Sequence, residues 1–190
     1  SLFRESDGSL LFRPAGHGAL LENLNDLQAD VIFIKNIDNV VPDALKDSTI
    51  IYKKALGGLL VSILAQIESL EFQLAQDPSE QLIAEALVFM GRNLGYVPSA
   101  DFQSLFLAEQ VDVLLAILAR PTRVCGVVKN TGEPGGGPFW CPDATGNLTL
   151  QLVESAQVDM GNPGQKMLFA GSTHFNPVDL VCAPRGLDLV

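Results

Sequence analysis

The most constraining feature of this sequence is the apolar run Val31-Ile-Phe-Ile34, which is followed directly by the polar segment Lys35-Asn-Ile-Asp-Asn39. An apolar run without polar alternation is typical of a strand buried on both faces, as in a parallel sheet covered by helices. Before it, Ser9–Phe12 is a second short apolar run, and residues 19–27 repeat leucine at helical spacing. The order strand, helix, strand predicts a βαβ unit with two parallel strands and a right-handed crossover.

Residues 44–120 carry helical periodicity and predict a helical insertion within a single domain that spans 1–190. Apolar residues recur at the 3.6-residue period, and the segment Asp77-Pro-Ser-Glu80 has the composition of a helix start. Three helices are expected: one from Ser48, one capped by Asp77 with Pro78 at its first position and ending near Leu94, and one spanning 101–119.

A pair of glycines, Gly57-Gly58, interrupts the first of these helices. Each glycine costs about 1 kcal/mol relative to alanine inside a helix. We therefore expect either a break in the helix or another part of the chain lying close to its backbone. Lys53 and Lys54 are expected on the solvent-facing side, although they are near enough to the Lys35–Asn39 loop in sequence to reach a bound phosphate.

Residues 122–190 return to strand-like patterns. The expected strands are Arg123–Val128, Leu148–Val153, Met167–Ala170 and Val178–Cys182. Between the first two, residues 132–140 must form a loop because they contain three consecutive glycines, followed by Phe139 and Trp140. This loop is either a lid over a site or, as we favour, an ordinary connection whose aromatic side chains lie in the core.

Composition excludes several classes of protein. The net charge of −10 and the pI near 4.5 argue against nucleic-acid binding, which needs clustered basic residues. The mean hydropathy of +0.26 indicates a packed chain, but no segment reaches the roughly 18 uninterrupted apolar residues of a membrane span. The three cysteines are odd in number and have no zinc-site spacing, so free thiols are expected. We expect a soluble cytoplasmic protein without a membrane partner.

Two loops carry candidate chemistry. In Arg13-Pro-Ala-Gly-His-Gly18, backbone amides and the helix N-terminus that follows can hold an anion, with Arg13 adding a bidentate contact to phosphate. The alternative is a tight turn between a strand and a helix. The Lys35–Asn39 loop leaves the carboxyl end of a predicted parallel strand, where ligands bind in open sheets. Asp38 is a candidate Mg²⁺ ligand there, and the alternative is an Asx turn.

These segments resemble the UTP–sugar-1-phosphate uridylyltransferases, and most closely a bacterial group of that type. Arg13–Leu24, "RPAGHGALLENL", followed by Val31–Asn39, "VIFIKNIDN", is similar to the paired phosphate-binding motifs of that family. Arg123–Val128 and Val153–Gln157 resemble the strand and the "VEYSE" element, and Thr173–Asn176 resembles the "NHFF" element. These motifs cover about a third of the chain, and the helical zone has no counterpart.

The resemblance implies a mostly parallel, nucleotidyltransferase-like (GT-A or Rossmann-like) α/β sheet with a helical insertion. It also implies a set of site residues. Asp38, as the Mg²⁺ ligand, and Arg13, as a phosphate ligand, would be catalytic. Glu154 would bind sugar hydroxyls, and His174 would line the sugar pocket. The full set of substrate-binding positions is Gly16, His17, Gly18, Asn36, Asn39, Glu154, His174 and Asn176.

The chain departs from the family pattern at three points. Gln157 replaces the second acid of "VEYSE", and Thr173 replaces the Asn of "NHFF". The family's glycine-rich triphosphate loop should precede Arg13 and is not present, so we expect a fragment of a longer protein that is inactive by itself. The function implied is Mg²⁺-dependent nucleotidyl transfer to a sugar 1-phosphate. Two alternatives remain open: a non-catalytic module that binds a sugar nucleotide or sugar phosphate, and an interaction protein that uses the helical insertion.

Overall fold

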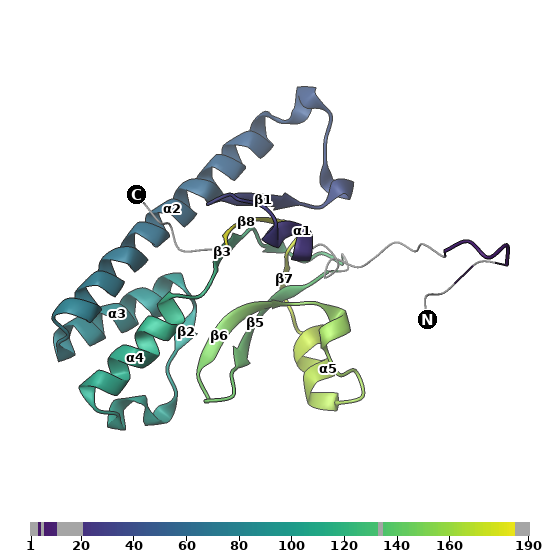
Figure 1. Cartoon of the computed structure of the whole chain (residues 1–190). Coiled ribbons are helices and arrows are strands. Elements are labelled where there is room, and N and C mark those ends of the chain that lie inside the picture. The colour runs from purple at the N-terminus through teal and green to yellow at the C-terminus, as the bar shows by residue number, and fades with distance from the viewer. Residues whose placement is uncertain (1–3, 5, 11–20, 133–134, 185–190) are drawn as a thin grey trace.

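The computed structural model describes residues 4, 6–10, 21–132 and 135–184 (Figure 1). The α-helices are α1 (Leu21–Asn25), α2 (Asp47–Gln76), α3 (Glu80–Asn93), α4 (Leu107–Leu118) and α5 (Pro163–Ala170). The strands are β1 (Ile32–Lys35), β2 (Tyr96–Val97), β3 (Thr122–Cys125), β4 (Val128–Lys129), β5 (Gly137–Pro142), β6 (Leu148–Val153), β7 (His174–Phe175) and β8 (Asp179–Ala183).

The predicted parallel sheet is wrong. In the part of the chain that the structure describes, the strands form three small sheets with the orders β1-β8-β3, β2-β6-β5 and β4-β7, and every strand pair is antiparallel. The strand β1 pairs antiparallel with β8 from the far end of the chain and has no parallel neighbour among the described residues. The other predicted strand of the βαβ unit, Ser9–Phe12, lies partly outside them. The protein is therefore α/β in content but lacks the mostly parallel nucleotidyltransferase-like sheet that the motifs suggested.

The two faces of the β1-β8-β3 sheet explain why the first three residues of β1, Ile32–Ile34, are all apolar. Phe33 and Val181 are paired in register and face α2, where Val181 is completely buried. Ile34 and Leu180, the next pair, face the opposite side and line a cavity. A strand with a helix on one face and an apolar cavity on the other needs no polar alternation, and this arrangement does not require parallel neighbours.

The helix α2 organises the core. It packs against α3, α4, β3 and β8, and in Figure 1 it runs the length of the molecule beside the β1-β8-β3 sheet. The buried hydrophobic cluster draws mainly on the four helical segments between residues 56 and 118, and it extends to β8 through Val181 and Ala183. The core therefore lies between the helices and one face of this sheet.

By length and composition alone, α2 is also apolar enough to cross a membrane, with a mean hydropathy of 1.5 in its best window. This is weak evidence, because the core helix of a soluble protein passes the same test. Leu60, Ile63, Leu64 and Ile67 of α2 belong to the buried cluster. Other apolar side chains of α2 are at least half exposed, including Leu59 and Phe72.

Three of the sequence-based boundaries are also corrected. The helix α3 is capped by Ser79, whose hydroxyl accepts from the Leu82 amide, and it begins at Glu80 rather than after Asp77. Residues 167–170 form the end of α5 rather than a strand, because Asn162 caps a helix that begins with Pro163. The third helix of the insertion begins at Leu107 rather than at Asp101, because Ala100–Ser104 forms a separate 3₁₀ turn.

The β5–β6 hairpin is fixed by its turn. Asp143 accepts hydrogen bonds from the backbone and hydroxyl of Thr145 and from the backbone and side chain of Asn147. These bonds hold the pKa of Asp143 down at about 2. Asn147 is buried, and its carbonyl oxygen accepts hydrogen bonds from the Tyr96 hydroxyl at 3.1 Å and from the Ser99 amide at 2.9 Å. The turn therefore attaches the hairpin to the helical part of the fold.

Candidate binding site

The loop after β1 and the segment before β8 meet. The backbone amide of Asn36 donates to the carbonyl of Val178 at 2.9 Å, and the side chain of Asn39 donates to the carbonyl of Pro177 at 2.7 Å. The Lys35–Asn39 loop was singled out as a site element, and its partners Pro177 and Val178 directly follow the second such motif, Thr173–Asn176, so the structure brings the two motifs near each other. The carboxamide of Asn36 caps the 3₁₀ turn Ile37–Asn39 by accepting from the Asp38 amide, which is the Asx geometry that the sequence left open.

Asn176 lies at the centre of this junction and is buried. Its side chain donates to the Gly126 carbonyl and accepts from the Val178 amide, and its backbone amide donates to the Gly136 carbonyl. Val178 adopts a φ of 54°, which is strained for a β-branched residue. Because the carboxamide of Asn176 is already bonded on both sides, its main role is to hold three segments in place around the cavity described below.

Asp179 forms an ion network on the α2 side of the sheet. Its two carboxylate oxygens accept from Lys35 at 2.8 Å and from Lys53 at 2.7 Å. Burial by itself raises the pKa of Asp179, but the hydrogen bonds and charges of the two lysines outweigh burial and lower it below its ordinary value. Lys53 is thus committed to Asp179 and to the ring of Phe33, 5.5 Å away, rather than to a phosphate.

A cavity of about 840 Å³ opens on the other face of the same sheet. Its walls come from β8, the β5–β6 hairpin, α5 and the 3₁₀ turn Ser155–Gln157. The apolar part includes Leu180, Phe139 and Phe169. The rings of Phe139 and Phe169 stack with their centroids 5.8 Å apart. The polar part consists of Arg123, Gln151, Glu154, Gln157, Gln165 and Asn176. An apolar hollow with a few convergent polar groups is the usual form of a small-molecule site.

Arg123 supplies the cation of this cavity. It lies on β3, opposite Cys182, on the face that points away from α2. Its guanidinium donates to the side-chain oxygen of Gln151 at 2.9 Å, and no carboxylate of the described residues lies within 4.0 Å of it. A guanidinium bonded only to a neutral amide keeps most of its charge available for an anionic ligand.

Glu154 supplies the carboxylate. It follows directly after β6, and the side chain of Gln157 accepts from its backbone amide at 2.9 Å. The carboxylate lies against Gly136, where a Cβ atom would come within 2.5 Å of Oε1. At Gly137, an added Cβ would lie 2.9 Å from the His174 carbonyl. Gly136 and Gly137 therefore pack closely beside the cavity. The predicted loop is shorter than 132–140, because Gly137 begins β5, and the aromatics Phe139 and Trp140 lie on the wall of the cavity rather than in the core.

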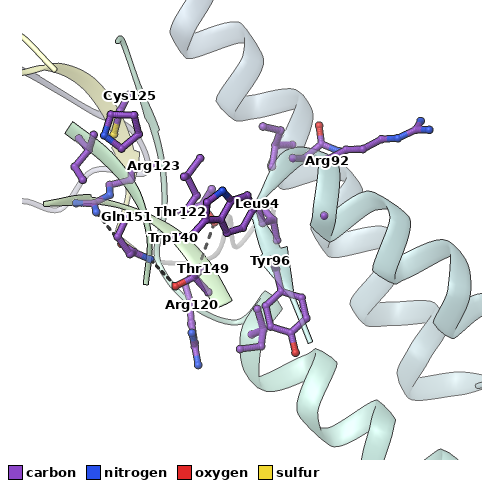
Figure 2. A pocket seen from close by; sticks show the side chains of 18 of the residues that line it. Arg92, Leu94, Tyr96, Arg120, Thr122, Arg123, Cys125, Trp140, Thr149 and Gln151 are labelled. Carbon is purple, nitrogen blue, oxygen red and sulfur yellow. Dashed lines mark hydrogen bonds between the residues drawn. The ribbon is translucent and has the colours of Figure 1, made fainter. Parts of the chain in front are cut away.

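A second cavity, of about 410 Å³, lies beside the first (Figure 2). The two share four lining residues, Arg123, Trp140, Gln151 and Leu152. Figure 2 shows Trp140 between Leu94 and Thr149, with the hydrogen-bonded chain from Arg123 through Gln151 to Thr149 along one side. The hairpin that carries Trp140 thus separates two hollows with different linings.

Comparison with known protein families assigns the chain. The family described as "Domain of unknown function (DUF4301)" matches residues 1–188. The chain belongs to the DUF4301 family. No curated protein and no solved structure matches it significantly.

In this DUF4301 domain the expected site residues are divided. Arg13, Gly16, His17 and Gly18 lie outside the described residues. Of the others, Glu154 and Asn176 line the large cavity, and Asn36 and Asn39 belong to the adjoining junction. Asp38 is exposed beside this junction, and His174 is exposed on β7, where its ring nitrogen Nδ1 contacts the hydroxyl of Thr173 at 2.9 Å. Neither of these last two lines the large cavity.

A metal site built from protein ligands alone is not present in the described part of the chain, where no group of three His, Cys, Asp or Glu side chains is suitably placed. Asp38 alone fits only the Mg²⁺ arrangement in which water and ligand phosphates complete the coordination. The three cysteines are free, and burial raises the pKa of Cys125 and of Cys182, so neither thiol is activated as a nucleophile.

Sequence reasoning missed Arg123, Gln165 and Phe169 as site residues. The alternation of β3 was the available signal for Arg123, because it places this side chain on the face opposite Val124. Gln165 and Phe169 were missed because α5 was not predicted: Phe169 was placed in a strand over 167–170, and Gln165 was left outside any element.

Proposed function

We propose that this domain binds a phosphorylated sugar, free or as part of a sugar nucleotide, in the large cavity. The observation that carries the proposal is that Arg123 and Glu154 line the same cavity. Arg123 is a cation bonded to the neutral side chain of Gln151, and Glu154 is a carboxylate. Arginine suits phosphate because its guanidinium donates two parallel hydrogen bonds. A carboxylate accepts hydrogen bonds from sugar hydroxyls, and a side-chain amide both accepts and donates them, so both groups suit a sugar.

The remaining lining supports this ligand class. Gln157 and Gln165 add amide groups near Glu154, and the rings of Phe139 and Phe169 offer an apolar surface to the faces of a sugar ring. The size is also suitable, because ligand sites of this kind commonly have volumes of about 300–1,000 Å³.

The helix α5 forms one wall of this cavity. None of its residues is buried, and the Phe139–Phe169 ring stack is the ring contact that joins it to the hairpin. In this proposal α5 closes over the ligand, and closure adds Gln165 and Phe169 to the contacts.

Nucleotidyl transfer to a sugar 1-phosphate is the second candidate. The observation in its favour is that the Asp38 loop is bonded, through Asn39, to Pro177, the neighbour of the cavity residue Asn176. In that reaction Asp38 would hold Mg²⁺ with the ligand phosphates, and positioning and charge neutralisation would supply the catalysis. The cytoplasm, where sugar phosphates occur, is the corresponding proposed location.

A thermal-shift panel with sugar 1-phosphates, nucleoside triphosphates and UDP-sugars, each with and without Mg²⁺, tests both candidates. Binding raises the melting temperature in proportion to the logarithm of ligand concentration above Kd. We expect a rise with a sugar phosphate or sugar nucleotide that Glu154→Gln reduces and that Asp112→Asn, at an exposed acid on α4, does not. A rise that needs Mg²⁺ and is lost in Asp38→Asn supports the second candidate. No rise with any compound would refute both.

A further inference from the structure

We propose that the smaller cavity is a separate site for a small aromatic anion, with Trp140 as the stacking surface and Arg120 and Arg123 as the cationic groups. This site goes beyond the proposed sugar-phosphate function, since it uses a different hollow and adds Arg120, which does not line the large cavity, to the shared Arg123. The argument rests on the charge of the lining, on the unused donors of the arginines and on the exposed indole.

The lining of this cavity reverses the charge of the protein. The chain carries a net charge of −10, with 22 acidic residues against 12 basic ones. Yet no aspartate or glutamate is found among the described residues that line the cavity, whereas Arg120 and Arg123 line it and Arg92 lies on its rim. A hollow lined by one sign of charge with low-dielectric walls concentrates the opposite charge.

The guanidinium groups of Arg120 and Arg123 have hydrogen-bond donors that no described residue uses. Arg123 donates to Gln151, and the side chain of Arg120 makes no hydrogen bond with any described residue. The nearest carboxylate to Arg120 is Asp143, at 4.0 Å, and both oxygens of that carboxylate are already occupied by Thr145 and Asn147 in the hairpin turn. An anion in the cavity would therefore meet a guanidinium that is free to turn towards it.

The direction of the side chains distinguishes Arg120 from Arg92. Figure 2 shows Arg92 extending along the outside of α3, away from Trp140, while Arg120 leaves the rim directly below Thr149. The side chain of Arg120 is half exposed, so it can turn across the mouth of the cavity without breaking a buried contact. Arg92 contributes to the rim through its position but not through its charge.

Trp140 favours an aromatic ligand over a bare anion. Trp140 is 52% exposed, which is high for the largest aromatic residue, and it lines the cavity together with Leu94 and with Leu150, its register partner on β6. An indole face binds planar groups, and an arginine near it binds the attached anionic group. Aromatic phosphates and aromatic carboxylates share this chemistry.

Trp140 is the single tryptophan of the chain and lines both cavities, so its fluorescence reports binding in either one and the variants below tell the two apart. We would titrate the protein with phenyl phosphate, benzoate and phenol. Phenyl phosphate or benzoate should change the fluorescence in a saturable way. The compound that binds more tightly shows whether the site prefers a phosphate or a carboxylate. Phenol, which lacks the charge, should bind at least about tenfold more weakly.

Variants locate the binding. Arg120→Gln should weaken binding of the aromatic anion at least about tenfold, while Arg92→Gln, the matched control on the same rim, should leave it within about twofold. Equal binding of phenol, or an unchanged affinity in Arg120→Gln, would overturn the proposal. Glu154→Gln should leave this titration unchanged. If it changes the affinity instead, as the loss of a negative charge beside a bound anion would, the anion occupies the large cavity, the second site is refuted and the sugar-phosphate function is untouched.

Discussion

Lys53, in the second turn of α2, donates a hydrogen bond of 2.7 Å to Asp179, the first residue of β8. Lys35 of β1 donates to the other oxygen of the same carboxylate. One acid therefore joins the long helix to two strands that are far apart in the sequence. These side chains are about one-fifth exposed, so water only partly replaces the contacts when one is removed.

The first prediction concerns this network. Asp179→Asn leaves two partly buried ammonium groups with a neutral partner, and we expect it to lower the free energy of unfolding by about 1–3 kcal/mol. Asp43→Asn, which breaks the exposed pair with Lys46, is the control and should change it by less than about 0.5 kcal/mol. Urea unfolding of both variants measures this, and equal effects would contradict the role given to Asp179.

The second prediction follows from the lowered pKa of Asp179. A carboxyl whose pKa is lower in the folded state stabilises the protein above its unfolded pKa of about 3.9. That contribution is lost as the pH falls through the folded pKa. The wild type should therefore lose more stability than Asp179→Asn between about pH 5 and pH 2. Parallel pH profiles for the two proteins would contradict this, even though Asp143, with a pKa of about 2, adds its own acid dependence to both.

The third prediction uses two neighbouring glycines of α2 as a matched pair. A Cβ atom on Gly57 would lie 2.9 Å from Cζ of Phe33, whereas one on Gly58 would meet nothing within 4 Å. Gly58→Ala should stabilise the protein by about 0.5–1 kcal/mol, because alanine favours the helix. Gly57→Ala should destabilise it by about 1 kcal/mol, because the ring must move away from Lys53. Thermal unfolding decides, and a gain in both variants would refute the close contact.

The fourth prediction concerns Asn147. Asn147→Ala removes the acceptor of the buried Tyr96 hydroxyl and should cost about 1–3 kcal/mol. If the loss arises from the unpaired Tyr96 hydroxyl, Tyr96→Phe should lower the free energy of unfolding less in the Asn147→Ala background than in the wild type. A double-mutant cycle measures the difference, and strict additivity would show that the hydrogen bond contributes nothing.

Sequence patterns predicted the local structure better than the sheet. The helical period placed α2 and α3, and the glycine pair correctly indicated a close approach, which is that of Phe33. Strand order could not be obtained in this way, because the apolar run of β1 fits burial between two parallel neighbours as well as it fits a helix on one face and a cavity on the other. The pairing of β1 with β8 depends on contacts across the whole chain.

The candidate site was predictable only in part. The motifs that contain Asp38 and Asn176 do meet, although the pattern that suggested their meeting implied a different sheet. Glu154 was found by its resemblance, while Arg123 and the α5 residues were not. A strand pattern does not reveal which cation lacks a carboxylate partner, because that depends on which acids the fold brings near it.

The most direct test of the proposed function is the affinity of the domain for the tightest sugar phosphate of the panel, measured by isothermal titration calorimetry. Glu154→Gln and Arg123→Gln are compared with Asp112→Asn. The account predicts that each of the first two weakens binding at least about tenfold and that the control stays within about twofold of the wild type. Affinities that are the same in all four proteins would place any bound sugar phosphate outside the large cavity and contradict the proposal.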